Sequence, residues 1–258
     1  MNKNSLKNIA TEVINLEIDA LKTLKKTINK NFDKAVNAIV NCQSKIILCG
    51  VGKSGLIAAK IASTLSSVGS PAFSLSANDC LHGDLGSITK KDILILISNS
   101  GKSEEIIPII KFANRNKIKL IGIVSKKNSF LYKGSDIKIL LPEVKESGLG
   151  VVPTSSTSIQ LAIGDALAVA ALKKKQFSKY DFSRLHPGGN LGKQLKTVSD
   201  IMAIGVRIPF ISESKSMREA IKTISKKKLG VVIVRNKNKT TTGIITDGNI
   251  RKLKQKNI

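Results

Sequence analysis

Short apolar runs alternate with longer helical segments between residues 45 and 175, and this alternation is the strongest constraint on the fold. The apolar runs are KIILCG (45–50), PAFSLS (71–76), DILILIS (92–98), IKLIGIVS (118–125) and IKILLP (137–142). Segments with helical character lie between or after them, at 54–69, 103–116 and 155–175. Continuous apolar strands separated by helices are typical of a parallel sheet covered on both faces. The sequence therefore predicts an α/β fold with a doubly wound, flavodoxin-like parallel sheet.

Two further regions flank this predicted sheet. Before it, apolar residues at steps of three and four predict an amphipathic helix at 4–30, and a second helix is expected at 32–41. After it, the pattern changes to that of a separate, smaller α/β module. We therefore expect one domain of residues 1–193 and a second of residues 198–258. Helices that precede such a sheet often pack on a neighbouring subunit, which favours an oligomer.

The charge and composition of the chain restrict the classes of partner. A net charge of +25 suits a nucleic-acid-binding protein, but only six of the 43 basic residues are arginine and aromatic residues make up 3%. We therefore expect no nucleic-acid partner, and a basic surface that steers anionic substrates. No apolar run approaches the roughly 18 residues of a membrane span. The N-terminus lacks an apolar signal core, so we expect a cytoplasmic protein without a membrane partner.

The segment GVGKSG (50–55) follows the first predicted strand and begins the next helix. Its glycines would let backbone amides approach an anion at the helix N-terminus, with Gly52 and Ser54 as candidate binding residues. It is not a Walker A loop, because that pattern would need a glycine at Ile47. The alternative is a structural turn in which Ser54 caps the helix. The segment by itself does not decide between the two.

The segment SNSGKSEE (98–105) follows the third predicted strand in the same way. Ser98, Ser100 and Ser103 supply hydroxyl groups, Gly101 permits an unusual backbone angle, and the first amides of a helix attract anions. The alternative is a capping box, with Ser103 as the cap and a glutamate in the first turn. One serine is enough for a cap, so three serines and a glycine favour an anion site.

The chain has two histidines, His82 in HGDLG and His186 in HPGG. A lone histidine is more often structural than catalytic, but a position in a glycine-containing loop favours a functional site. Two histidines and three cysteines without C-x-x-C spacing do not predict a structural metal site.

Together, GVGKSG, HGDLG, SNSGKSEEI, GLGVVPTSSTSIQLAIGDALAVAAL and HPGGNLGK resemble the motifs of the arabinose-5-phosphate isomerase family. The resemblance covers essentially the whole chain and implies a sugar isomerase (SIS) domain followed by paired CBS modules. It implies interconversion of D-ribulose 5-phosphate and D-arabinose 5-phosphate through a cis-enediol, without a cofactor or required metal. This reaction leads to 3-deoxy-D-manno-octulosonate and lipopolysaccharide. The resemblance also implies a cytoplasmic homotetramer.

The family's functional residues can be carried over position by position. Its catalytic positions fall on Lys53, Glu105, Glu146 and His186. Its substrate contacts fall on His82, Gly69 and Ser70, and also in the 108–117 helix and the 142–144 turn. The isomerisation needs a base for the carbon-bound proton and an acid for the oxygens. Glu105 is the first candidate for the base, but its role and that of His186 could be exchanged.

The chain departs from the family at two points, and two other functions stay open. Ser76 stands where the family often has a histidine, so no metal site is expected there. The chain ends after one CBS module, which we expect to be the first of a pair and to have a nucleotide as a possible ligand. The alternatives are a non-catalytic sensor of sugar phosphates and an isomerase of a related capsule or sugar-alcohol pathway.

Overall fold

The computed structural model describes residues 5–186 and 198–255, and the chain divides into two compact units, residues 1–195 and 196–258. The first unit holds five parallel strands, β1 (Ile46–Gly50), β2 (Ala72–Ser76), β3 (Ile93–Ser98), β4 (Lys119–Val124) and β5 (Ile137–Leu140). Their order in the sheet is β2-β1-β3-β4-β5, which is the order of flavodoxin-like doubly wound folds. The predicted fold class is therefore confirmed.

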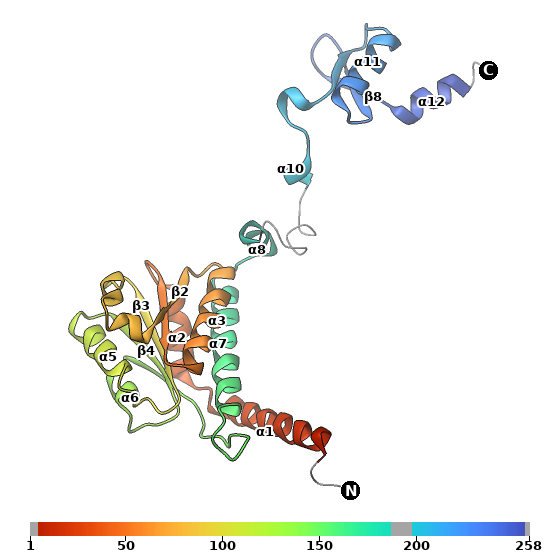
Figure 1. The fold of residues 1–258 in the computed structure, drawn as a ribbon. Coiled ribbons are helices and arrows are strands. Elements are labelled where there is room, and N and C mark those ends of the chain that lie inside the picture. Colours follow the sequence, from red (N-terminus) through yellow and green to blue (C-terminus); the bar gives the residue numbers. More distant parts are fainter. Residues whose placement is uncertain (1–4, 187–197, 256–258) are drawn as a thin grey trace. The chain divides into compact units, whose positions relative to one another are not determined.

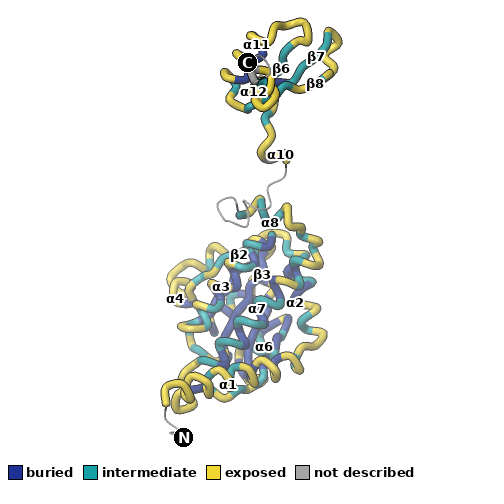
Figure 2. The backbone as a smooth tube through the Cα atoms, turned by 90° about the vertical axis from the view of Figure 1, so that its right-hand side faces the viewer, coloured by how far each residue is buried: buried dark blue, intermediate teal, exposed yellow. Residues whose placement is uncertain are grey.

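Helices cover both faces of this sheet (Figure 1). One face carries α1 (Leu6–Thr27), α2 (Lys30–Val40), α3 (Lys53–Ser67) and α7 (Ser155–Lys174), and the other carries α4 (Ala77–Cys80), α5 (Ile106–Arg115) and α6 (Phe130–Gly134). Alternate residues of β1 pack on opposite faces. Ile46 and Leu48 pack into the apolar layer under α1, α2, α3 and α7, and Ile47 and Cys49 pack into the layer under α4, α5 and α6. Figure 2 shows buried strands such as β3 at the centre of the unit. The apolar runs in the sequence are continuous because both faces are covered.

Helix α7 is the central helix of the first layer and packs against α1, α2 and α3. Within the described residues it is also the one helix long and apolar enough to cross a membrane. Half of its most apolar window is buried inside the unit. Packing against the sheet layer therefore accounts for the apolar composition of α7.

Short elements were not predicted from the sequence. They are α4, the 3₁₀ turn η1 (Asp84–Ser87), α6 and α8 (Lys179–Leu185). Each has seven residues or fewer, which is too short for a periodic apolar pattern to appear.

The second unit is a small α/β module. It contains α10 (Val198–Ile201), η2 (Gly205–Arg207), β6 (Phe210–Ser212), α11 (Met217–Lys227), β7 (Val231–Arg235), β8 (Thr241–Thr246) and α12 (Asp247–Gln255). Strand β7 pairs with β6 in parallel and with β8 in antiparallel. The buried centre consists of Ala220, Ile224 and Val232. Strand β6 was not expected, because its three residues lie in a segment without an apolar run.

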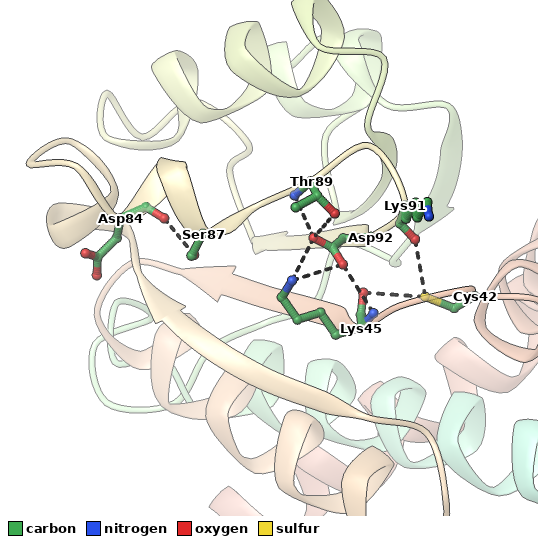
Figure 3. A network of polar contacts seen from close by, with 7 residues as sticks. All are labelled: Cys42, Lys45, Asp84, Ser87, Thr89, Lys91 and Asp92. Atoms are coloured by element: carbon green, nitrogen blue, oxygen red, sulfur yellow. Dashed lines mark hydrogen bonds and ion pairs between the residues drawn. The ribbon is translucent and has the colours of Figure 1, made fainter.

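An ion pair between the partly exposed Lys45 and the buried Asp92 joins the amino ends of β1 and β3 (Figure 3). The side chain of Asp92 is fully buried, and Lys45 Nζ lies 3.0 Å from its Oδ2 atom. The amide and hydroxyl of Thr89 donate to the same oxygen at 2.6 and 2.9 Å. Burial raises the pKa of Asp92, but hydrogen bonds from Ser44, Thr89 and Lys45 outweigh it and hold this pKa at about 2.

We expect Asp92→Ala to lower the free energy of unfolding by about 2 kcal/mol, because Lys45 and Thr89 lose the charged acceptor that they share. The pKa of Asp92 falls on folding, so its contribution is complete above the ordinary value of 3.8 and is lost as the pH falls towards 2. Urea unfolding at pH 7 and at pH 3 measures both effects. Asp19→Asn, which removes the exposed partner of Lys22, is the control and should change little. Equal stability of Asp92→Ala and wild type at pH 7 would contradict the prediction.

Candidate active site

The order of the strands reverses between β1 and β3. Strand β1 pairs with β2 on one side and with β3 on the other, so the loops that follow β1 and β3 leave the same edge of the sheet side by side. Gly50 is the register partner of Ile97, which places Val51 beside Ser98. Ligands of open parallel sheets bind in the crevice at such a reversal, beyond the carboxyl ends of the strands. Both anion-site segments predicted from the sequence lie here.

Glycines of the first loop bring helix α3 against the end of β1. A Cβ atom on Gly50 would lie 2.8 Å from the carbonyl carbon of Ser54, and one on Gly55 would lie 2.8 Å from the Gly50 oxygen. Gly52 has a φ of +55° and is the N-cap of α3, without a side-chain cap. The interpretation of Ser54 as the cap is therefore wrong, because Ser54 already lies inside the first turn. Its hydroxyl donates instead to Gln160 Oε1 of α7 at 3.1 Å.

Lys53 is the first residue of α3, and its side chain is exposed at the carboxyl edge. Within the part of the chain that is described, its ammonium makes no hydrogen bond or ion pair. This cation is therefore available to a ligand in the crevice.

Serine hydroxyls shape the second loop. The buried Ser98 Oγ accepts from the Gly101 amide at 3.0 Å, and Ser100 Oγ accepts from the Lys102 amide at 3.3 Å. Gly101 has a φ of +63°, and a Cβ atom there would collide with Ser129 and Val124. Two of the three predicted phosphate-binding hydroxyls therefore also hold the loop in shape, and only glycine fits at its centre.

Helix α5 starts later than the sequence predicts. Its first residue is Ile106, and its N-cap is Glu105, which makes no side-chain capping bond. The alternative of a capping box with Ser103 is therefore wrong. The amides of Ser103, Glu104 and Glu105 donate to no other described residue. Three unpaired amides, with the half-buried Glu105 carboxylate beside them, are a suitable receptor for an anion next to a base.

A cleft of about 660 Å³ opens next to this loop. Its lining comes from the loops after β3, β4 and β5, and consists of Ser100, Lys102, Ser125, Lys126, Lys127, Asn128 and residues 140–143. Lys126 forms an ion pair with Glu143 at 2.6 Å. The sequence analysis missed the lysines at 126 and 127. Their position directly after an apolar run, like that of Ser98, is the signal that could have found them.

Glu146 lies between β5 and α7 and binds the first turn of α7. Its Oε2 atom accepts from the amides of Thr154 and Ser156 at 2.9 and 3.3 Å. Burial raises the pKa of Glu146, but hydrogen bonds from Ser156 and Thr154 outweigh it, so this pKa lies below its ordinary value. The carboxylate is therefore held ionised at the start of α7, where the helix dipole also favours negative charge.

The two histidines lie at opposite edges of the sheet. His82 follows β2 and the short helix α4, and it is exposed at the carboxyl edge, where its amide donates to the Asp79 oxygen. His186 follows α8, beyond the end of α7. Its Nδ1 atom lies 2.8 Å from the Phe182 oxygen, and its ring stacks on Phe182 at 3.8 Å. The remainder of the HPGG motif, residues 187–189, lies outside the described residues.

Gly69 and Ser70 also lie at the amino edge, immediately before β2. Lys175, at the end of α7, donates to the Gly69 oxygen at 3.0 Å and to the Ser70 hydroxyl at 2.8 Å. Ser70 is fully buried. Within one chain, the structure therefore does not bring Gly69, Ser70 and His186 together with Lys53 and the other candidates at the carboxyl edge.

Both units match known family models. Residues 39–170 match the SIS domain and residues 198–256 match the CBS domain. The arabinose 5-phosphate isomerase KdsD of Yersinia pestis is 42% identical over 244 residues, which cover 94% of this chain and 74% of that protein. The chain belongs to the arabinose 5-phosphate isomerase family.

The first unit is also similar to solved structures. The Escherichia coli CFT073 protein c3406, solved in complex with arabinose 5-phosphate, has a TM-score of 0.69 and 34% identity, and the match covers 72% of this chain and all of that chain. A putative phosphosugar isomerase involved in capsule formation from Bacteroides fragilis has a TM-score of 0.68 and 34% identity, over 72% of this chain and 99% of that chain.

The isomerase family positions thus fall into two groups in this structure. Lys53, Glu105, Glu146 and His82 lie at the carboxyl edge with the Ser98–Ser103 loop, whereas His186 lies at the amino edge. Within the described ranges 5–186 and 198–255, no group of three or more His, Cys, Asp and Glu side chains could hold a metal ion.

Proposed function

We propose that this protein is an aldose–ketose isomerase that interconverts D-ribulose 5-phosphate and D-arabinose 5-phosphate. The observation that carries the proposal is the 42% identity to the Yersinia pestis isomerase across 94% of the chain. The product would enter the synthesis of 3-deoxy-D-manno-octulosonate for lipopolysaccharide, which is consistent with the cytoplasmic location expected from the sequence.

The phosphate group of the substrate binds at the loop after β3. The unpaired amides of Ser103, Glu104 and Glu105 supply donors, and the hydroxyls of Ser98, Ser100 and Ser103 line the same loop. Lysines of the adjacent cleft add positive charge. Phosphate binding far from the reacting carbons positions C1 and C2, so its binding energy serves the chemical step.

The proton transfer between C1 and C2 takes place beside this phosphate site. Glu105 is the candidate base, because its carboxylate lies at the start of α5 and forms no capping bond. Lys53 stabilises the negative oxygen of the cis-enediol, since an oriented cation in a crevice is effective at developing charge. Glu146 is an ionised carboxylate of the same edge, and His82 orients a sugar hydroxyl. His186 transfers protons to and from the oxygens.

A complete site then requires two copies of the chain. Helix α7 has 20 residues and returns the chain from the carboxyl edge to the amino edge over about 30 Å. His186 therefore serves the site of another subunit, together with the Gly69–Ser70 turn. Helix α1 is largely exposed (Figure 2). Its exposed apolar side chains, which an interface would cover, include Leu6, Ile9 and Ile14. These features support the homotetramer that the family resemblance implies.

The CBS unit is proposed to regulate the isomerase. CBS modules pair to form a nucleotide-sized cleft, so this module would contribute half of such a cleft, either with a further module or with the same module of another subunit. A nucleotide is accordingly the ligand that we propose for it.

A related isomerase activity is the second candidate function, because the Bacteroides fragilis structure with 34% identity is described as involved in capsule formation. An assay of purified protein with ribulose 5-phosphate, with and without a chelator, decides between the arabinose 5-phosphate isomerase and an isomerase of another sugar phosphate. We expect arabinose 5-phosphate to form at equal rates in both samples, and fructose 6-phosphate to remain unchanged as the control. Binding of ribulose 5-phosphate without turnover would instead support a sensor, and an absence of arabinose 5-phosphate would contradict the proposal.

A further inference from the structure

Gln160 is a fully buried polar residue of α7 that contacts the start of α3. Its Oε1 atom accepts from the hydroxyl of Ser54 at 3.1 Å, and Ser54 is the residue directly after Lys53. The Nε2 atom of Gln160 has no hydrogen-bond partner among the described residues. A buried amide with an unpaired donor is costly to the fold, so its presence in an apolar layer requires an explanation.

The same face of α7 also reaches Glu146. Ser156 precedes Gln160 by four residues, so both side chains lie on one face of the helix. The Ser156 amide donates to Glu146 at 3.3 Å, and the Ser156 hydroxyl contributes to the lowered pKa of that carboxyl. Helix α7 therefore contacts Glu146 through Ser156 and, one turn later, contacts Ser54 of α3 through Gln160.

Lys53 lies in the first turn of α3, directly before Ser54. Its side chain forms no bond with another described residue, and Gly52, which caps α3, offers no side-chain cap. The hydroxyl of Ser54 is the side-chain anchor of this first turn, and Gln160 is its acceptor.

We propose that Gln160 is a positioning residue of the isomerase: through Ser54 it fixes the first turn of α3, so that Lys53 keeps its place relative to Glu146 at the carboxyl edge. This inference rests on the proposed function. A displacement of about 1 Å in a catalytic group can lower the rate on the order of 10²-fold, so loss of the Ser54–Gln160 bond should reduce the chemical step more than substrate binding.

The test is Gln160→Met, which keeps the size of the side chain and removes the acceptor for Ser54. We expect kcat for arabinose 5-phosphate formation to fall roughly 10–10²-fold, with KM changed by less than about threefold. Ser54→Ala should have the same effect. In the Lys53→Ala background, Gln160→Met should lower kcat no further. Gln43→Met, at an exposed glutamine of the amino edge, is the control and should leave kcat unchanged.

The outcomes separate this inference from the proposed function. Wild-type protein without turnover of ribulose 5-phosphate would overturn both. An active wild type with unchanged kcat in Gln160→Met would overturn the positioning role alone. An equal loss of kcat in the wild-type and Lys53→Ala backgrounds would also overturn it, because that result indicates general damage to the fold. Should Gln160→Met fail to fold in a thermal melt, Ser54→Ala provides the same comparison from a partly exposed position.

Discussion

Glu105→Gln is expected to lower kcat for the conversion of ribulose 5-phosphate by roughly 10²–10⁴-fold, the usual effect of removing a positioned base. The amide has nearly the shape of the carboxylate but cannot accept the carbon-bound proton. KM should change much less, because the amides of Ser103, Glu104 and residue 105 remain in place for the phosphate. Initial rates over a range of substrate concentrations measure both constants.

Glu104→Gln is the matched control for this substitution. The side chain of the adjacent Glu104 is exposed and has no role in the proposed mechanism, and the substitution keeps its backbone amide, so kcat should stay near the wild-type value. Solvent deuterium at C2 of the product reports proton transfer at carbon directly. If Glu105→Gln still incorporated deuterium at the wild-type rate and His186→Ala did not, the two roles would be exchanged.

Two inactive variants, Glu105→Gln and His186→Ala, are expected to restore activity when their subunits are mixed. The two residues lie at opposite edges of one chain, so a site completed by a second subunit uses Glu105 from one copy and His186 from the other. In a mixed dimeric unit, one site then carries both substitutions and the other carries neither. Random pairing of equal amounts should return about a quarter of the wild-type activity in the unfractionated mixture, and a larger share once the inactive unmixed oligomers are removed.

The control for this experiment mixes Glu105→Gln with Lys53→Ala. Both residues lie at the carboxyl edge of the same chain, so every mixed site keeps one defect and activity should stay low. The variants are co-expressed with different affinity tags, and mixed oligomers are purified through both tags before the assay. Failure of Glu105→Gln and His186→Ala to complement would show that His186 acts within its own chain or not at all.

Local patterns predicted most of the sheet unit correctly. Five apolar runs became five parallel strands. The runs are most continuous in β1 and β3, which are buried along their whole length, because a strand covered on both faces has no exposed side chain to interrupt the run. The loops after β1 and β3 were also identified in advance. Glycine permits the unusual backbone angles of these two turns and serine accepts from an amide of the second, and both requirements are local.

Contacts between distant parts of the chain could not be predicted in the same way. Ser54 was interpreted as a helix cap, whereas its hydroxyl binds Gln160, 106 residues further along the chain. Similarly, Ser103 was considered as the cap of α5, although that helix starts only at Ile106. Lys126 and Lys127 line the cleft only because the fold brings the loops after β3 and β4 side by side.

The sequence by itself determined the class of fold, the family and most of the chemistry available to the protein, since apolar periodicity and short motifs are encoded locally. Only the tertiary structure decided which of those groups meet. Parallel strands bring Lys53, Glu105 and Glu146 to one edge, whereas α7 carries the chain back and leaves His186 at the other. The physical reason is that the direction of a long helix is set by its packing against the sheet, and no local pattern records where its far end will lie.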